Sequence, residues 1–144
     1  MPTRTASLEH AFTHAHYHVL LPGGRVTVRI GSKPPVMRAW LRTNGYTPPT
    51  WSLITAWNPG AEVRNPGQNR RAQRRLEEDL DQAGWYWVPG IARDPDKRWP
   101  DEPGVWVPGM AAGEGLVWAK RVGQLAIVAG DEDGTARLCW VRQA

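Results

Sequence analysis

The period of the hydrophobic pattern changes along the chain, and each period predicts a type of element. Apolar positions alternate in segments 17–21 and 25–30, on either side of a Pro-Gly-Gly turn, and this arrangement predicts a β-hairpin. Segment 51–57 is almost continuously apolar between turn-forming residues, which is typical of a strand covered on both faces. Shorter apolar runs predict further strands at 85–88, 105–107, 125–129 and 136–141.

Helical periodicity and capping residues predict four helices. The clearest begins after Asn65, with Pro66 in its first turn, and runs to about Ala83, where Gly84 stops it. Three shorter helices are expected at 7–14, 34–42 and 111–121. Hairpins interleaved with helices indicate an α+β fold, in which helices pack on a single mixed, mostly antiparallel sheet. Residues 1–144 contain no repeat and no long linker, so we expect a single domain.

Composition narrows the class of protein. The chain is 41% hydrophobic and 22% charged, as an ordinary globular protein is, and its 18 basic and 14 acidic residues give a formal charge of +4. Cys139 is the only cysteine, which excludes an intrachain disulfide and a thiolate metal cluster. Without an apolar run that could span a membrane or form a signal peptide, we expect a cytoplasmic protein with no membrane partner. Walker-type and Rossmann glycine motifs are missing, so no cofactor is expected.

The end of the apolar run 51–57 is the first candidate site. There the chain reads Trp57-Asn58-Pro59, and the Asn58 amide offers one acceptor and two donors. Such an amide either binds a small polar ligand or ties the turn to itself, and the sequence leaves both interpretations open.

The predicted helix over 66–83 carries its charges in an unusual order. Four basic residues crowd its first half and four acidic residues its second half: Arg70, Arg71, Arg74, Arg75, Glu77, Glu78, Asp79 and Asp81. The helix macrodipole favours the opposite order, so the arginines indicate a role such as gripping an anion. Asn69 falls on the helix face expected to meet the sheet, where its amide needs a partner, either a ligand or the neighbouring loop.

Two further polar residues stand beside predicted strands. Glu102 precedes the strand at 105–107 and is the carboxylate best placed to act as a general base or to orient a ligand. Gln124 opens the strand at 125–129 with an amide. Each signal is weak alone and gains weight if these residues lie near Asn58 and Asn69.

The four histidines all lie in one short stretch, at His10, His14, His16 and His18. Their spacing fits no strong zinc signature, and Glu9 is the only acidic residue beside them. We therefore predict no metal site, with adventitious nickel or zinc binding as the alternative.

Several of these residues also form a pattern that resembles a known family. The chain carries Arg29-Ile30-Gly31, Ile54-Thr55-Ala56-Trp57-Asn58-Pro59, Asn69, Trp99 with Glu102, Gly109, and Gly123-Gln124-Leu125-Ala126. From about Tyr17 to Trp140 it is similar to an uncharacterised bacterial family, domain of unknown function 3293. The family pattern has an aromatic residue before the Gly-Gln pair, an Asn after it and a Ser soon after the glutamate, where this chain has Val122, Leu125 and Pro103-Gly104. The resemblance implies no reaction.

The sequence thus predicts a polar pocket for a small anionic ligand, such as a nucleotide-like or carboxylate metabolite, with hydrolysis or group transfer as the reaction. Glu102 would be the general base, and the ligand would be bound by Asn58, Asn69, Gln124, Arg29 and Arg70. The alternative is a nucleic-acid-binding module that contacts phosphates through Arg64, Lys97, Arg98 and the arginines of the helix over 66–83. An interaction protein with an exposed aromatic patch is a third hypothesis.

Overall fold

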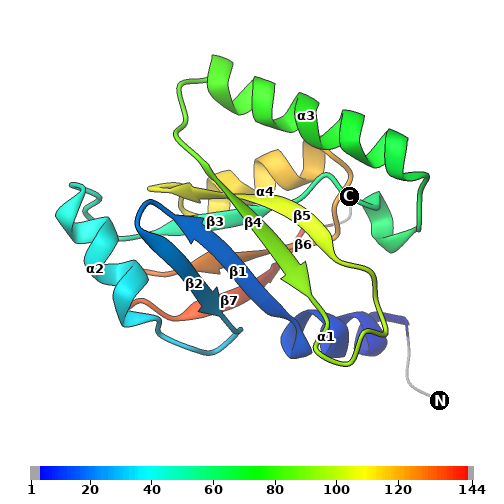
Figure 1. Cartoon of the computed structure of the whole chain (residues 1–144), viewed down its shortest axis with the longest axis horizontal. Helices are drawn as coiled ribbons and strands as arrows, with labels where there is room; N and C mark the ends of the chain where they lie inside the picture. The colour runs from blue at the N-terminus through cyan, green and yellow to red at the C-terminus, as the bar shows by residue number, and fades with distance from the viewer. Residues whose placement is uncertain (1–3, 143–144) are drawn as a thin grey trace.

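The computed structural model describes residues 4–142, which form four α-helices and seven strands (Figure 1). In chain order the elements are α1 (Arg4–His14), β1 (His16–Leu21), β2 (Gly24–Val28), α2 (Pro35–Thr43), β3 (Trp51–Ile54), the 3-10 turn η1 (Pro59–Ala61), α3 (Pro66–Gln82), β4 (Val88–Arg93), β5 (Glu102–Pro108), α4 (Ala112–Arg121), β6 (Ala126–Gly130) and β7 (Ala136–Trp140). This confirms the predicted α+β class. No helix in this range is long and apolar enough to cross a membrane.

The seven strands form one strongly curled sheet in the order β2-β1-β4-β5-β3-β6-β7, with every neighbouring pair antiparallel. The curl brings its two edges together just beyond β2. There the Gly31 N–H donates to the Ala136 carbonyl at 2.7 Å, and the Ala136 N–H donates to the Ser32 carbonyl at 2.9 Å. The sheet therefore has an enclosed concave face and an outer convex face.

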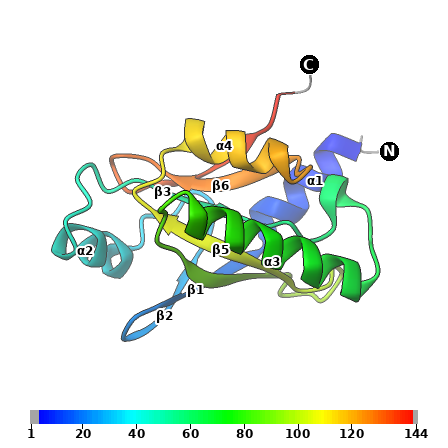
Figure 2. The ribbon, with the colours of Figure 1, turned by 90° about the horizontal axis from the view of Figure 1, so that it is seen from above.

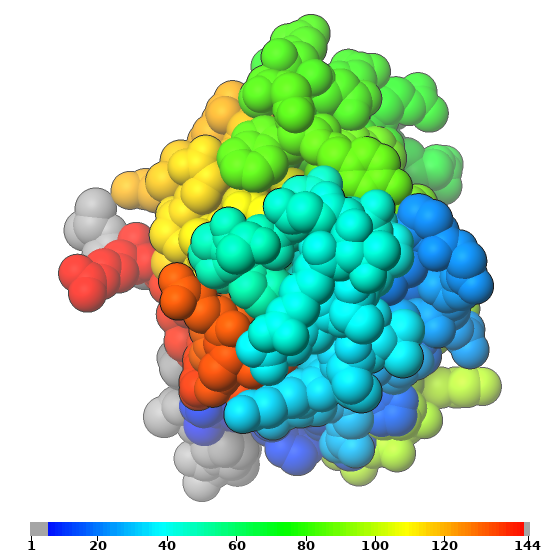
Figure 3. Space-filling view, turned by 90° about the vertical axis from the view of Figure 1, so that its left-hand side faces the viewer, coloured from blue at the N-terminus to red at the C-terminus, as the bar shows by residue number. Residues whose placement is uncertain are grey.

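The concave face is filled mainly by inward side chains of β1, β3, β5 and β6, which alternate with outward ones along each strand. Two helices meet this face at opposite ends of the molecule, α2 at one end and α1 at the other (Figures 1 and 2). Helix α2 inserts Met37 and Leu41 among Trp51 and Trp106, and all four side chains are fully buried. Figure 3 looks onto this end of the molecule, with α2 in cyan across its centre.

The convex face carries α3 and α4, which run along the same side of the sheet (Figure 2). Leu76 and Leu80 of α3 and Trp118 of α4 pack on the outward side chains of β3, β5 and β6. Helix α3 begins as predicted: the Asn65 side chain accepts a hydrogen bond from the Gly67 N–H at 2.7 Å, and Pro66 follows the cap.

Most strand boundaries differ from the predictions by one or more residues, and the differences in β3, β4 and β5 affect the site. Strand β3 ends at Ile54 rather than at residue 57, because the Thr55 hydroxyl accepts a hydrogen bond from the Trp57 N–H at 2.9 Å and closes a turn. Strand β4 covers Val88–Arg93, so the strand predicted at 85–88 is wrong except for its last residue. Glu102 does not precede β5 but begins it.

Candidate functional site

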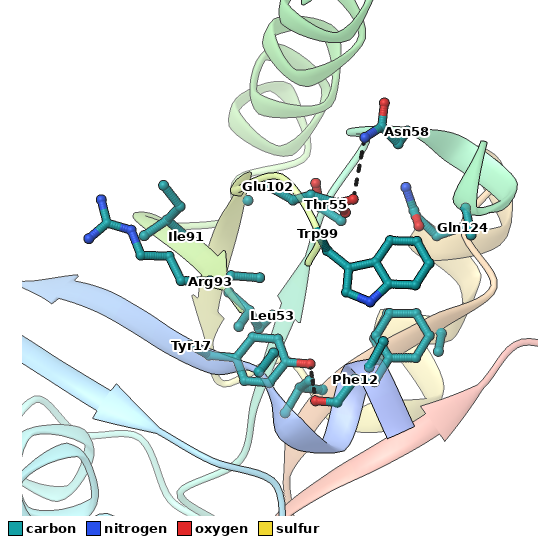
Figure 4. Close-up of a pocket in the computed structure, with 18 of the residues that line it drawn as sticks. Phe12, Tyr17, Leu53, Thr55, Asn58, Ile91, Arg93, Trp99, Glu102 and Gln124 are labelled. Atoms are coloured by element: carbon teal, nitrogen blue, oxygen red, sulfur yellow. Dashed lines mark hydrogen bonds between the residues drawn. The ribbon is translucent and has the colours of Figure 1, made fainter. Parts of the chain in front are cut away.

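A cavity of about 120 Å³ lies at the α1 end of the concave face. Helix α1, the inner sides of β3, β4 and β6, and the loop between β4 and β5 form its walls. Most of the lining is apolar, and Figure 4 shows the rings of Phe12, Tyr17 and Trp99 around it. Trp99 is 45% exposed and so belongs both to the cavity and to the surface. The space resembles the dry cavity of about 150 Å³ that accepts a benzene ring in a well-studied engineered protein.

The cavity exists because the strands present small residues to it. Gly90 of β4 pairs with Gly104 of β5, and both residues line the space. A Cβ atom would lie 2.9 Å from Leu53 Cδ1 at Gly90, and 2.8 Å from the Ile54 carbonyl oxygen at Gly104. Both contacts are too short: at Gly104 the backbone itself would have to shift, whereas at Gly90 the end of the Leu53 side chain would have to move aside. Glycine in β4 also explains why the hydrophobic pattern does not reveal this strand.

Glu102 directs a carboxyl group into this apolar space (Figure 4). It shares the concave side of β5 with Gly104 and Trp106, because alternate residues of a strand face the same way. Burial raises the pKa of Glu102 from 4.5 to about 7, and the hydrogen bond from Asn58 opposes the shift. Burial, and secondarily the charge of Glu102, also raise the pKa of Tyr17 well above its usual value. Glu102 can therefore accept or release a proton near neutral pH.

Asn58 links Glu102 to α3. Its Nδ2 atom donates to Glu102 Oε2 at 3.4 Å, while its Oδ1 atom accepts from Asn69 Nδ2 at 2.7 Å and from the Arg64 N–H at 2.9 Å. In return, Asn69 Oδ1 accepts from the Asn58 N–H at 2.9 Å. Asn58 has φ 47° and ψ 61°, a left-handed conformation that asparagine tolerates better than most residues. The reciprocal pair fixes both the turn and the amide that holds Glu102.

Two glutamines hold the chain on either side of this turn. Gln124 lines the cavity and donates from Nε2 to the Trp57 carbonyl at 2.8 Å. Gln73 lies on the buried face of α3, and its Oε1 atom accepts from the Ala56 N–H at 2.9 Å. The sequence does not single out Gln73, although its position four residues after Asn69 on the sheet-facing side of α3 is a usable signal.

The predicted site residues thus fall into three groups. Asn58, Glu102 and Gln124 line the cavity, and Asn69 is buried behind Asn58 without reaching the lining. Arg29 and Arg70 are exposed and lie outside the lining, Arg29 just after β2 and Arg70 on the outer face of α3. Arg93 does line the cavity, but its Nε donates to Asp101 Oδ2 at 3.1 Å.

The remaining predicted phosphate-contacting residues are also on the surface. All of these predicted phosphate-contacting side chains are exposed, and none forms a salt bridge within the described range: Arg64, Arg70, Arg71, Arg74, Arg75, Lys97 and Arg98. The acidic second half of α3 therefore does not neutralise the arginines of its first half by direct pairing.

A curled antiparallel sheet with a carboxyl-bearing, mainly apolar cavity at one end defines this molecule as an α+β protein with a cavity that is partly open to the surface. The chain belongs to the family described as "Protein of unknown function (DUF3293)", whose model matches residues 54–127, just over half of the sequence. The match is shorter than the resemblance from Tyr17 to Trp140, and it includes Asn58, Asn69, Glu102 and Gln124. Neither the curated proteins nor the solved structures contain a significant match to this chain.

Proposed function

We propose that the cavity binds a small ligand and that Glu102 exchanges a proton with it. The observation that carries this proposal is the largely buried carboxyl group of Glu102, which is hydrogen-bonded to a fixed amide at a mainly apolar cavity. An ionisable side chain of strongly shifted pKa in a cavity is a recurrent feature of functional sites.

The shape and lining of the cavity favour a ligand with a small apolar body. A volume of about 120 Å³ suits one ring or a short branched chain, and Phe12, Tyr17 and Trp99 offer aromatic surfaces to it. At the polar end, Glu102 and Gln124 supply oxygen acceptors, so the ligand should carry a hydrogen-bond donor such as N–H or O–H.

The charges around the cavity favour a neutral or cationic polar group over the anionic one that the sequence suggests. Among the described residues, Arg93 is the only basic residue that lines the cavity, and it already forms a salt bridge with Asp101. Above pH 7 an ionised Glu102 adds a negative charge to the polar end, which repels a carboxylate or phosphate. The edge of a heterocyclic base remains compatible with this proposal, because it presents N–H groups.

The reaction that we propose is hydrolysis or group transfer with Glu102 as the general acid–base group. A carboxyl group of pKa about 7 is divided between its two protonation states at neutral pH, which is the condition for efficient proton transfer in both directions. Asn58 would orient the carboxyl group, and Asn69 would hold Asn58 without touching the substrate.

A fragment screen at pH 6 and pH 8 tests this proposal. Ring-sized fragments that carry an N–H or O–H group should raise the melting temperature of the wild-type chain, and Glu102→Gln should weaken the best of them about tenfold or more at pH 8. Glu78→Gln, on the surface of α3, is the matched control and should bind like the wild type. Equal affinity in all three proteins, without pH dependence, would exclude a role for Glu102.

The exposed, unpaired arginines of α3 favour a second candidate function, contact with nucleic-acid phosphates. Arg70 and Arg74 lie one turn apart on an exposed flank of the helix, beside its buried face. Glu78 and Asp81 follow on the same side and would repel phosphates, so the small-ligand proposal is the stronger. The test is binding of a generic duplex: the double variant Arg70→Ala/Arg74→Ala should weaken it and flatten its dependence on salt.

A further inference from the structure

We propose that His14, Asp94 and Asp96 form a binding site for a divalent transition-metal ion such as Zn²⁺. His14 lies at the end of α1, and the two aspartates belong to the loop after β4. Asp94 also lines the cavity, so the site lies at the cavity wall, where α1 and this loop meet. None of these three residues is Glu102 or one of the asparagines that hold it, so metal binding can be tested independently of the function proposed above.

The three side chains are almost close enough to share one ion. Their ligand atoms all lie within 4.8 Å of one another, and His14 Nε2 lies 2.8 Å from Asp96 Oδ2. In a tetrahedral zinc site with bonds of about 2.0–2.1 Å, neighbouring ligand atoms are roughly 3.3 Å apart. A coordination set therefore requires these atoms to move closer together from separations of up to 4.8 Å, and the exposed Asp96 is the side chain with most freedom to move.

The loop holds the Asp94 carboxylate in place. Its Oδ1 atom accepts from the Asp96 N–H at 2.9 Å, and its Oδ2 atom accepts from the Arg98 N–H at 2.8 Å. Each carboxylate oxygen keeps a lone pair for a metal, and fixed carboxylates of this kind are usual around metal ions.

Charge and orientation also favour a cation at this position. Two carboxylates less than 5 Å apart repel one another, and a divalent ion would neutralise both. The imidazole of His14 is stacked on that of His10, with ring centroids 5.4 Å apart and planes 11° from parallel, which restricts its rotation. Nε2 of His14, the atom that faces Asp96, is the one available to the metal.

The ligand types select the class of ion. One imidazole nitrogen and two carboxylate oxygens suit Zn²⁺, Ni²⁺, Co²⁺ or Mn²⁺, whereas Ca²⁺ and Mg²⁺ prefer oxygen-only sites with more ligands. Three protein ligands leave at least one position of a zinc ion for water or for a polar group of a bound molecule. Of the three ligands, Asp94 lines the cavity, whereas His14 and Asp96 are outside its lining.

The sequence does not predict this site, because its ligands are far apart along the chain. His14 and Asp96 are 82 positions apart, and the histidine stretch alone contains no suitable acidic partner. His10, His16 and His18 do not belong to the cluster, and His18 is hydrogen-bonded through Nδ1 to the Thr27 hydroxyl at 2.9 Å.

Calorimetric titration of the tag-free full chain with Zn²⁺ at pH 7.5 tests the site. The expected result is one saturable site per chain, weakened at least tenfold by His14→Ala and by Asp96→Asn. His18→Ala is the matched control, since it removes a histidine of the same stretch that is outside the cluster and does not stack on His14, and it should bind like the wild type. Circular dichroism would verify that each variant is folded.

Two outcomes would overturn the inference. One is the absence of saturable binding to the wild-type chain. The other is an equal loss of binding in His18→Ala and His14→Ala together with normal binding in Asp96→Asn, because that pattern assigns the ion to the histidine stretch as an adventitious ligand. With Co²⁺ as the probe, the site predicts a visible absorption band typical of low coordination number, which Asp96→Asn should remove.

Discussion

A helix covers each end of the concave face, but large side chains pack together at one end and a cavity lies at the other. At one end α2 packs Met37 and Leu41 with Trp51 and Trp106, and all four side chains are fully buried. At the other end α1 covers the small residues Gly90, Gly104 and Ala126, and a cavity with a carboxyl group remains.

This difference shows that the cavity is a property of particular residues and not of the fold. Strands β3, β4, β5 and β6 contribute to both ends, so the same sheet can be close-packed or hollow depending on which side chains it directs inward. An ionisable Glu102 in the hollow end lowers stability when it is charged. Residues that cost stability yet build a fixed geometry are typical of functional sites.

The largest difference in the free energy of unfolding is expected when one leucine at each end is replaced by alanine. Leu41→Ala should reduce the free energy of unfolding by about 2–5 kcal/mol, because it leaves a new void in a filled core. Leu8→Ala should cost less than about 1 kcal/mol, because Leu8 is only half-buried and already borders the cavity. Urea denaturation of both variants measures the difference, and equal costs would contradict the contrast between the two ends.

The next effect concerns the pH dependence of stability. Because the folded chain keeps the Glu102 proton to about pH 7 while the unfolded chain releases it near pH 4.5, the unfolded state binds fewer protons in between. The free energy of unfolding should therefore fall as the pH rises through this window, by up to about 3 kcal/mol for this group.

Glu102→Gln isolates that contribution from those of other titrating groups. It should be more stable than the wild type at pH 8 and should approach it near pH 4.5, since a neutral amide replaces a group that is costly when charged. Denaturant melts of both proteins from pH 4.5 to pH 8 give the difference curve. A flat curve would show that Glu102 titrates normally.

A smaller effect is expected from enlarging one alanine at each end. Ala136→Leu should cost about 1–3 kcal/mol, because Ala136 is fully buried within the filled core. Ala126→Leu should cost less, because its added atoms enter the cavity, and it should also abolish binding of any fragment found for the wild type. Retained fragment binding in Ala126→Leu would place the ligand elsewhere.

Local features of this structure could be predicted from the sequence, and long-range ones could not. Short-range sequence patterns predict the N-cap and the limits of α3, the first hairpin, and the burial of Asn69. The hydrophobic pattern does not predict β4 beyond Val88, because Pro89 and Gly90 normally interrupt strands. In the structure, Gly90 allows the Leu53 side chain to pack close to the β4 backbone. The cavity and the meeting of His14 with Asp96 depend on how distant segments pack, which no periodicity encodes.

The central claim is that Glu102 is a carboxyl group of raised pKa in a ligand-sized cavity. Its side-chain ¹³C chemical shift, assigned by comparison with Glu102→Gln and followed by NMR from pH 3 to pH 9, measures that pKa directly. The structure predicts a midpoint near 7. A midpoint near 4.5 would mean that Glu102 is solvated, and it would contradict the proposed site.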